Sequence, residues 1–439
     1  MSQRYTVPTY TTGSGNPVTC PFATERIGTN GPLLLQDSHL IEVLASFNRE
    51  KIPERIVHAK GTGAYGVFEV THDVTQYTCA QFLQPNTSSK VFVRFSTVGG
   101  EKGSADTARD PRGFAVRFYT EEGNCDIVGN NTPIFFLRDP VKFSPFIHTQ
   151  KRNPKTGLKD PNAHWTYVVE HQEALHQYFL LHSDRGTPAS YREMHGYGSH
   201  TYKLVKENGQ FVYVKFHFRA DLGFKTLSDE EATKLAGDDP DHHRRDLYEN
   251  IEKGNFPSWT LCIQTMTPEQ AEKAPFSIFD LTKVWPHADF PLQKVGKLTL
   301  NEVPKNFYAE VEQAALSPSN MVPGVAPSAD PVLQSRLFSY PDAQRYRLGV
   351  NFRQIPVNCP LHEFNPLLRD GAMRVDGNLG DYPTYLPSSA PIHYKVVPGM
   401  EHHERWVGTV TRFHWEASIE QGDFVQIQSL WNVFGKTNQ

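Results

Sequence analysis

Short runs in which apolar and polar residues alternate set the strongest constraint on the fold of this 439-residue chain. Between about residues 60 and 137 these runs are AYGVFEVTHD, KVFVRFSTVGG, GFAVRFYTEEGNCDIVGNN and TPIFFL. A second set contains HTYKLVKENGQFVYVKFHFRAD, with a turn at Asn208-Gly209, and then SWTLCIQTMT and VGKLTLNEV, after a helical insert near residues 228–254. Period-two alternation is typical of antiparallel strands with one buried face. Two sets of about four strands predict one closed antiparallel β-barrel of about eight.

The segments around the strands predict an α+β chain with four parts. Residues 1–50 are rich in Thr, Gly and Pro and contain one short amphipathic stretch, LIEVLASFNRE, which predicts an N-terminal arm with a helix. Residues 51–300 are expected to form the barrel domain with helical insertions. Residues 301–400 are rich in proline and poor in strand patterns, which predicts a long segment wrapping the barrel or a partner subunit. Residues 401–439 are expected to begin a C-terminal helical region that is shortened in this chain.

Composition narrows the classes of function. The 44 basic and 48 acidic residues are mixed along the chain and give a formal net charge of −4, so no long-range field favours nucleic acid or an anionic membrane. Five scattered cysteines without a CxxC pair indicate neither a disulfide framework nor a zinc site. The N-terminus lacks a signal-peptide pattern, no run approaches a membrane span, and the last residues are not of the Ser-Lys-Leu type. We expect a protein of a reducing intracellular compartment, with no readable targeting signal in this chain.

The segment DPVLQSRLFSYPDAQRYRLG, residues 330–349, predicts a capped helix over 331–348 with a proline in its interior. Arg336 lies four residues before Tyr340 and Arg347 seven after it, so all three can share one helical face. A single tyrosine is usually a half-buried aromatic with a satisfied hydroxyl. Keeping a tyrosine as phenolate at pH 7 requires about 4 kcal/mol, which a ferric ion and a buried arginine together can supply. The face therefore indicates an iron ligand, and tyrosine is one of the protein ligands known for haem iron.

A second candidate site joins a histidine to one of the predicted strands. His58 stands beside glycines in ERIVHAKGTGAYG, where a structural or exposed histidine is the usual alternative. In KVFVRFSTVGG, alternation places Arg94 and Ser96 on the face opposite the apolar residues. This cation can hold a carboxylate such as a haem propionate, and the hydroxyl can orient an imidazole. Asn130, in VGNNTPIFFLRD, suits a hydrogen bond in a dry pocket, although a turn is the strong alternative for two adjacent asparagines.

These residues and their surroundings resemble the haem catalases, in particular the monofunctional, small-subunit, NADPH-binding, fungal-like type. The similarity runs from about residue 20 to about residue 430. Its landmarks are RIVHAKGTGAYG, RFSTVGGEKGSADTARDPRGFAVRFYTEEGN, NNTPIFFLRDP, FIHTQKRNP, FDLTKVWPH and RLFSYPDAQRYRLG. Several of these stretches are long and tolerate little variation, so the match is more specific than a short motif.

The resemblance implies a role for each matching residue. His58 corresponds to the distal histidine, Asn130 to its partner in positioning peroxide, and Ser96 to the hydroxyl that bonds the histidine. Tyr340 corresponds to the axial iron ligand and Arg336 to the arginine that keeps it anionic. The remaining haem-binding positions are Arg55, Arg94 and Arg347 for the propionates, Val57, Phe135, Phe143 and Phe146 for the apolar pocket and channel, and His200, on the proximal side, which can couple to Asp330.

The resemblance also implies the partners. It indicates haem b as cofactor, hydrogen peroxide as the substrate that is dismutated, and a homotetramer. NADPH is expected at His176, Ser183, Arg185, His217, Arg219, Val284, Trp285 and His287, with ordinary surface residues as the alternative. Leu180 and His195 depart from the pattern, because an aromatic residue and an asparagine are common there.

Two other functions remain open at this point. Catalase-like enzymes that act on fatty-acid hydroperoxides, of the allene oxide synthase type, typically have threonine before the distal histidine, where this chain has Val57. A non-enzymatic haem-binding protein would need no groups for acid-base chemistry on peroxide, and His58, Ser96 and Asn130 together argue against it. Family members usually continue through a larger C-terminal domain, whereas this chain stops after LWNVFGKTNQ.

The pairs His242-His243 and His402-His403 are expected in solvated loops, because adjacent side chains point apart.

Overall fold

Two units make up the chain, Met1–Glu54 and Arg55–Gln439. The computed structural model describes residues 7–393, 397–401, 404, 408–412 and 424–437. In the first unit, helix α1 (Ser38–Phe47) is capped by the Asp37 carboxylate, which accepts the Leu40 N–H at 3.2 Å. The arm therefore contains the helix that the stretch LIEVLASFNRE predicts.

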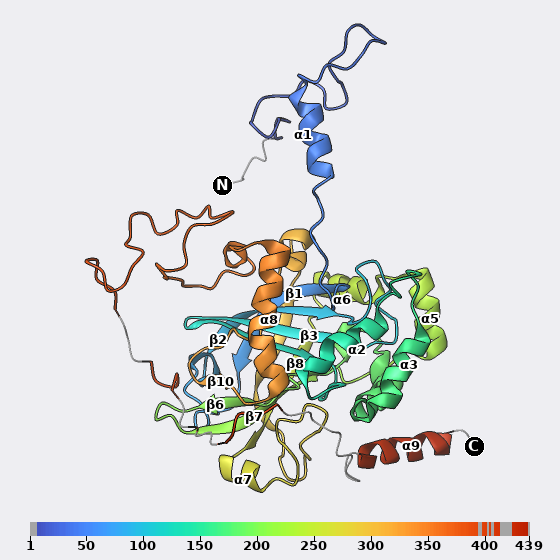
Figure 1. Ribbon diagram of the computed structural model, residues 1–439, viewed down its shortest axis with the longest axis vertical. Helices are drawn as coiled ribbons and strands as arrows, with labels where there is room; N and C mark the ends of the chain where they lie inside the picture. The colour runs from blue at the N-terminus through green and yellow to red at the C-terminus, as the bar shows by residue number, and fades with distance from the viewer. Residues whose placement is uncertain (1–6, 394–396, 402–403, 405–407, 413–423, 438–439) are drawn as a thin grey trace. The chain divides into compact units, whose positions relative to one another are not determined.

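An antiparallel barrel forms the frame of the second unit (Figure 1). Its strands are β1 (Gly61–Val70), β2 (Ser88–Ser96), β3 (Gly113–Thr120), β4 (Gly123–Asn130), β5 (Gly196–Tyr197), β6 (Tyr202–Val205), β7 (Phe211–Ala220), β8 (Ser258–Met266), β9 (Gln293–Glu302) and β10 (Val325–Pro327). Among the described residues the spatial order is β10-β6-β7-β5-β4-β3-β2-β1-β9-β8. A further pairing of β7 with β8 closes the ring, so that the eight strands from β7 to β8 form the barrel and confirm the predicted fold class.

The strands do not all lie where the sequence places them. The long run GFAVRFYTEEGNCDIVGNN forms two strands, β3 and β4, whereas TPIFFL forms none. Ile134, Phe136 and Leu137 in that segment are almost fully buried, in irregular backbone with bends. A short apolar run buried on all sides has no exposed face, so it cannot be distinguished from a buried strand by its composition.

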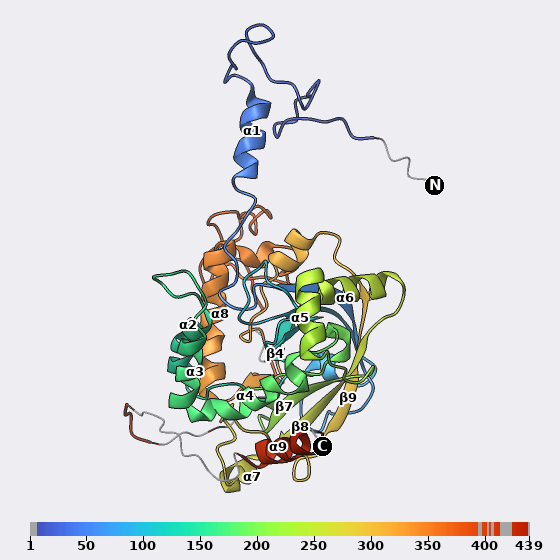
Figure 2. The same ribbon diagram turned by 90° about the vertical axis from the view of Figure 1, so that its right-hand side faces the viewer.

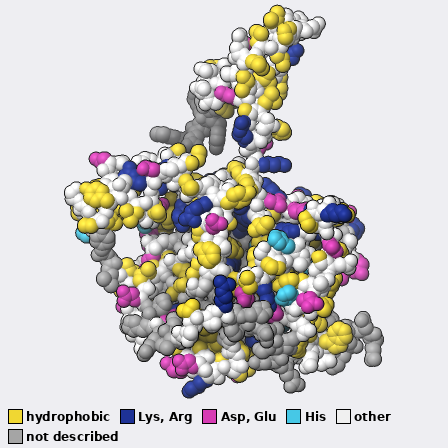
Figure 3. Space-filling view, in the orientation of Figure 1, with side chains coloured by type: hydrophobic (Ala, Val, Ile, Leu, Met, Phe, Trp, Pro, Cys, Tyr) yellow, Lys and Arg dark blue, Asp and Glu magenta, His cyan; other side chains and the backbone are white. Residues whose placement is uncertain are grey.

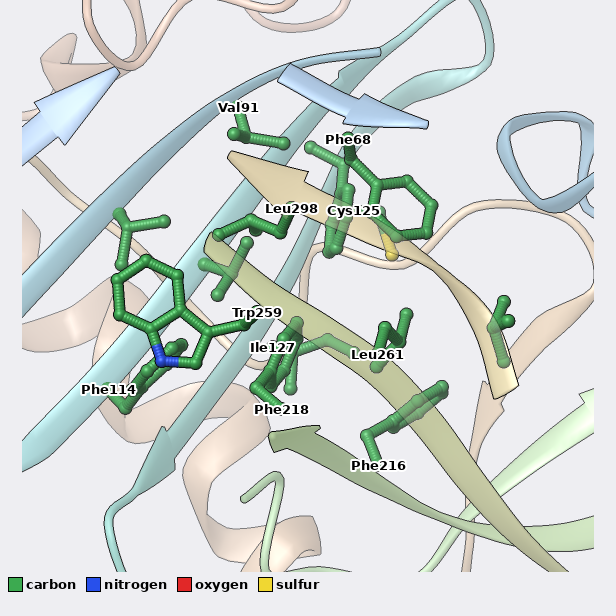
Figure 4. Packing of buried hydrophobic residues seen from close by; sticks show 14 of the residues in the cluster. Phe68, Val91, Phe114, Cys125, Ile127, Phe216, Phe218, Trp259, Leu261 and Leu298 are labelled. Carbon is green, nitrogen blue, oxygen red and sulfur yellow. The ribbon is translucent and has the colours of Figure 1, made fainter. Parts of the chain in front are cut away.

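The barrel interior holds the main hydrophobic core (Figure 4). Trp259 of β8 is fully buried there beside Phe114 of β3, and its indole N–H donates to the Met194 carbonyl at 2.9 Å. On β2, Val91, Val93 and Phe95 belong to this core. The intervening Arg94 and Ser96 therefore lie outside the barrel, as alternation predicts.

Helices cover the outside of the barrel. They are α2 (Phe143–Gln150), α3 (Pro161–Glu170), α4 (Leu175–His182), α5 (Asp229–Asp238), α6 (His242–Glu252), α7 (Pro268–Lys273), α8 (Pro331–Leu348) and α9 (Val425–Thr437). Short 3₁₀ helices are η1 (Gln81–Leu83), η2 (Pro140–Lys142), η3 (Gln172–Ala174), η4 (Asp184–Gly186), η5 (Tyr191–Glu193) and η7 (Phe352–Gln354), and η6 (Tyr308–Glu312) is a π-helical turn. In both views α8 lies on the same side of the barrel as α2 (Figures 1 and 2).

Helix α8 has the bounds that its sequence predicts. The Asp330 carboxylate accepts the N–H groups of Val332 and Leu333 at 3.0 and 3.1 Å, which caps the first turn. The helix stops at Gly349, whose φ of 97° favours glycine. The helix is unbroken at Pro341, so the residues on either side of the proline keep helical spacing.

The expectation for His242-His243 is wrong, because both residues begin helix α6 and His243 is fully buried. The Asp106 carboxylate accepts the backbone N–H groups of His243 and Arg244, each at 3.1 Å, and so caps this helix from a distant part of the chain. The His243 ring packs edge-on against Tyr191. The pair His402-His403 lies outside the described residues.

The surface carries charges of both signs. Lys and Arg side chains are interspersed with Asp and Glu on the face seen in Figure 3, in keeping with the mixed charge of the sequence. Within the described residues, none of the helices has the length and apolar character that crossing a membrane requires.

Candidate active site

Two adjoining cavities of about 240 and 260 Å³ lie between the outer face of the barrel and helix α8. Both are walled by His58 and by Tyr340, which are far apart in the sequence. The other residues that they share are Val57, Val128, Gly129, Phe143 and Ser339. An imidazole and a phenol thus border one largely apolar space.

On the histidine side, a hydrogen bond of 2.9 Å joins His58 Nδ1 to Ser96 Oγ. The His58 backbone has a φ of 62°, an uncommon conformation for a residue with a side chain, and its N–H donates to the Val98 carbonyl at 3.0 Å. Burial lowers the pKa of His58 to about 3, and the guanidinium groups of Arg94 and Arg336 act in the same direction. The imidazole is therefore neutral near pH 7 and available as a base.

Asn130 and Gly113 complete this side of the site. Asn130 is the last residue of β4, pairs with Gly113 of β3, and lines the 240 Å³ cavity with His58. A Cβ atom on Gly113 would lie 2.3 Å from Ser96 Oγ and 2.7 Å from His58 Nδ1. Only glycine leaves room for the Ser96–His58 hydrogen bond, a requirement that the sequence analysis did not identify.

On the tyrosine side, a chain of hydrogen bonds leads from Tyr340 into the body of the protein. Arg336 Nη2 donates to Tyr340 Oη at 2.6 Å, and Arg336 Nη1 donates to His200 Nε2 at 2.7 Å. Because arginine only donates, His200 Nε2 accepts, and the proton of the imidazole resides on Nδ1, which lies 2.7 Å from Asp330 Oδ2. Burial lowers the pKa of His200, in keeping with a neutral ring. The predicted coupling of His200 to Asp330 is thus present in the geometry.

The predicted arginine cluster borders the 260 Å³ cavity. Arg55 Nη2 donates to the carbonyls of Val311, Glu312 and Ala314 at 2.9 to 3.0 Å. Arg347 Nη2 lies 3.2 Å from Glu312 Oε1. Within the described residues, the buried atoms Arg55 Nη1 and Arg94 Nε have no hydrogen-bond partner. Leaving such donors unpaired costs about 1–3 kcal/mol each, so the cluster fits an anionic group.

The aromatic residues of the prediction form one wall. Phe135 and Phe143 line the 240 Å³ cavity, with their ring centroids 6.5 Å apart. Phe146 is fully buried and packs edge-on against Phe135 at 6.3 Å, behind the wall and not in it. The space between the phenol and the imidazole has apolar walls, and unpaired arginine donors border it. This combination fits a flat apolar group that carries carboxylates, such as haem.

A separate cavity of about 440 Å³ contains most of the residues predicted for the nucleotide. Its walls include Arg185, His217, Arg219, Val284, Trp285 and His287, with Leu180 at the position where an aromatic residue is common. Within the described residues, His217 Nδ1 and Trp285 Nε1 are buried without a hydrogen-bond partner. Both residues also line the cavity, so their unpaired polar atoms lie close to any ligand that binds there.

Three residues near this cavity do not line it. His176 bonds the Thr282 carbonyl at 3.1 Å and Gln426 Oε1 at 2.8 Å, and Ser183 Oγ donates to the Leu180 carbonyl at 2.7 Å. His195 Nδ1 accepts the Ala220 N–H at 3.0 Å. Burial, followed by Arg219 and Arg185, lowers the pKa of His195 to about 4. These side chains shape the surroundings of the cavity from behind its walls.

Lys215 and Ser199 were not predicted from the sequence. Both line the 440 Å³ cavity, and Ser199 also lines the 240 Å³ cavity beside His200. Lys215 precedes His217 and Arg219 by two and four residues on β7. Period-two alternation along β7 could have indicated that Lys215 lies on the same face of the strand as His217 and Arg219.

Comparison with known proteins gives one consistent family. A family model described as catalase matches residues 11–391. A peroxisomal catalase of Candida tropicalis is 60% identical over 432 residues, which cover 98% of this chain and 89% of the relative. Peroxisomal catalase A of Saccharomyces cerevisiae is 57% identical over 433 residues, covering 97% and 84%. A solved fungal catalase superposes with a TM-score of 0.95 at 57% identity, covering 97% of this chain and 86% of that structure.

Proposed function

Because this chain belongs to the catalase family and dismutates hydrogen peroxide to water and dioxygen, we propose that His58, Ser96 and Asn130 handle peroxide on one side of a haem held by Tyr340. The observation that carries the proposal is the shared wall of the two cavities, in which His58 and Tyr340 border the same apolar space. Haem supplies, when bound, an iron that exchanges electrons with peroxide.

The residues that would hold haem are those that border this space. Tyr340 provides the ligand oxygen, and Arg336 stabilises its anionic form through the 2.6 Å hydrogen bond. Arg55, Arg94 and Arg347 supply cations for the propionates, and the unpartnered Arg55 Nη1 and Arg94 Nε support this assignment. Val57 and Phe143 provide apolar surface in both cavities.

His58 moves the proton in this proposal. If Nδ1–H donates to Ser96 Oγ, the lone pair of Nε2 is left to take a proton from one peroxide oxygen and deliver it to the other, so that water leaves. Burial keeps the ring neutral and ready to accept. The Asn130 amide can orient peroxide by hydrogen bonding but has no proton to exchange at neutral pH. Ser96 and Asn130 are therefore positioning residues and His58 the acid-base residue.

The walls of the cavity also bear on the choice of substrate. Val57 stands where the fatty-acid hydroperoxide enzymes typically have threonine, and Phe135 and Phe143 narrow the approach. Two assays on the same haem-loaded sample test this point. An oxygen electrode follows oxygen release from hydrogen peroxide, and absorbance follows the loss of a fatty-acid hydroperoxide. Rapid oxygen release from hydrogen peroxide with negligible loss of the fatty-acid hydroperoxide is expected. Loss of the fatty-acid hydroperoxide without oxygen release from peroxide would overturn the proposal.

We also propose that NADPH occupies the 440 Å³ cavity. Arg185 and Arg219 provide cations for a phosphate, and the unpartnered atoms of His217 and Trp285 provide polar contacts. Calorimetry with NADPH and NADH tests the site. Arg219→Gln should weaken NADPH binding more than NADH binding, whereas Lys234→Gln, at an exposed position on α5, should change neither. Absence of NADPH binding to the parent protein would contradict the proposal.

We infer a homotetramer from the family and from apolar side chains that this chain leaves exposed. Ile41, Val43, Leu44 and Phe47 of α1 are all 47% or more exposed. In the second unit, Leu361, Phe364, Leu367 and Leu368 are at least 50% exposed. Such surfaces are typical of subunit contacts. Light scattering at micromolar concentration should give four times the chain mass, and a monomer would contradict the inference.

We infer the location from the names of the relatives. Those from Candida tropicalis and Saccharomyces cerevisiae are named as peroxisomal catalases, which supports a peroxisomal or cytoplasmic location for this protein. Fluorescence microscopy of the tagged protein beside a peroxisomal marker tests it. Signal confined to any other organelle would contradict the inference.

A further inference from the structure

Lys215 is a buried lysine whose ammonium group donates a hydrogen bond to a backbone carbonyl group. It is 5% exposed, and its Nζ donates to the Ser199 carbonyl at 2.7 Å. The same Nζ lies 5.4 Å from the centroid of the Trp285 ring. Burial lowers the pKa of Lys215 to about 8, so the group is still mainly charged at pH 7. Burying an ammonium group costs free energy unless the group is paired or hydrogen-bonded. The hydrogen-bond partner of Lys215 therefore indicates what this lysine does.

The partner is a strained turn. Ser199 has a φ of 61°, and the N–H of His200 donates to the Gly198 carbonyl at 2.7 Å across it. A three-residue turn with its central residue at positive φ is rare, because side chains crowd the backbone there. Ser199 Oγ donates to the Thr132 carbonyl at 3.1 Å. The turn is therefore fixed from two sides, by its own hydroxyl and by Lys215.

The turn carries His200, which is the acceptor for Arg336. Arg336 contacts both His200 Nε2 and Tyr340 Oη, at 2.7 and 2.6 Å. A displacement of the His200 ring would remove one of the two bonds that orient the guanidinium group. An unbroken series of contacts thus runs from Lys215 through the Ser199 turn to the phenol oxygen.

We propose that Lys215 is a positioning residue for the iron ligand: its hydrogen bond to the Ser199 carbonyl holds His200 where it fixes Arg336 against Tyr340. This inference rests on the proposed role of Tyr340 as the haem ligand. Lys215 touches neither the phenol nor the 240 and 260 Å³ cavities. Its charge also acts on His200 and Asp330, and the variant Lys215→Gln separates this effect from that of the hydrogen bond, because it removes the charge and keeps a donor.

The test compares Lys215→Met, which loses the donor, with Lys215→Gln, which keeps a neutral donor on a side chain that is one bond shorter. Lys203→Met is the matched control, because Lys203 is buried on the neighbouring strand β6 and pairs with Glu404 instead. The readouts are the ferric visible spectrum and the midpoint potential of the haem-loaded proteins. Thermal unfolding of each variant checks that it is folded.

Loosening the Arg336 hydrogen bond removes part of the stabilisation of the phenolate, so the ferric iron has a weaker anionic ligand. Lys215→Met is therefore expected to show a changed ferric spectrum and a more positive potential, while Lys215→Gln and Lys203→Met keep the parent spectrum. A parent-like spectrum and potential in Lys215→Met would overturn the proposal. So would a folded Lys215→Gln with an altered spectrum, a result that remains decisive if the Met variant does not fold. A parent protein whose spectrum shows no tyrosinate ligand would instead refute the proposed role of Tyr340.

Discussion

Arg336 lies one helical turn before Tyr340 on α8 and donates from Nη2 to the phenol oxygen across 2.6 Å. Its guanidinium carbon also lies 4.8 Å from the centroid of the Tyr340 ring. This side chain gives the phenol oxygen a fixed positive neighbour away from bulk water. The arrangement supports the proposed role of Tyr340 as an anionic ligand at neutral pH.

Replacing Arg336 by Met should therefore weaken haem binding. A hydrogen bond to a charged group contributes about 1.5–3 kcal/mol, which corresponds to roughly a ten- to hundredfold loss of affinity. Haem titration of the apoprotein, followed by absorbance, measures this loss. Arg345→Met, at an exposed position of the same helix, should leave the affinity unchanged. Equal affinities for both variants would contradict the role of Arg336.

Gly113→Ala should lower activity while haem stays bound. The added Cβ would meet Ser96 Oγ at 2.3 Å and His58 Nδ1 at 2.7 Å, so one of these groups has to move. Overpacking of this kind costs about 1–3 kcal/mol and displaces the imidazole. Oxygen evolution per bound haem measures the effect. At Gly103 an added Cβ meets nothing within 4 Å, and Gly103→Ala is expected to match the parent protein.

The low pKa of His58 predicts how activity and stability depend on pH. The imidazole titrates near 6.5 in the unfolded chain and near 3 in the folded one. Between these values the unfolded chain binds more protons, so this group's contribution to stability is present above pH 6.5 and is lost as the pH falls toward 3. Initial rates of oxygen evolution should stay level from pH 7 to 5, because His58 remains neutral. A decline in initial rate centred near pH 6.5, in a protein that circular dichroism shows to be folded, would be incompatible with this assignment.

The buried pair Arg117–Asp126 should be important for stability. Two hydrogen bonds of 2.7 and 2.8 Å join the side chains, and Arg117 also donates to the carbonyls of Ala315 and Val357. Breaking a buried pair costs about 3–5 kcal/mol, so Asp126→Asn should lower the free energy of unfolding by about that amount. The exposed pair of Arg152 and Glu101 provides the control, and Glu101→Gln should cost less than about 1 kcal/mol. Urea titration of both variants distinguishes them.

The sequence predicts the parts of the site that follow from regular geometry. Helical spacing brings Arg336 and Tyr340 together, and strand alternation separates Arg94 and Ser96 from the barrel core. The same rule applied to β7 would have placed Lys215 with His217. Local patterns thus identify which residues share a face.

Other features depend on contacts between distant segments. The burial of His243 follows from its cap, Asp106, which lies more than a hundred residues earlier. The positive φ of His58 and of Ser199 has no local sequence signature, because both conformations are imposed by hydrogen bonds to remote residues. The strand predicted for TPIFFL is not formed, for the same reason. This segment is buried by contacts with the surrounding fold and not by pairing with another strand. Such features require the structure.

The central claim is that His58 moves the proton across from Tyr340. Oxygen evolution by His58→Ala, measured at equal bound haem against the parent protein, tests it most directly. Acid-base catalysis by a positioned side chain contributes about 10²–10⁴-fold, so the variant should keep the parent's haem content and lose at least a hundredfold in rate. A variant that binds haem and evolves oxygen at the parent rate would contradict the account.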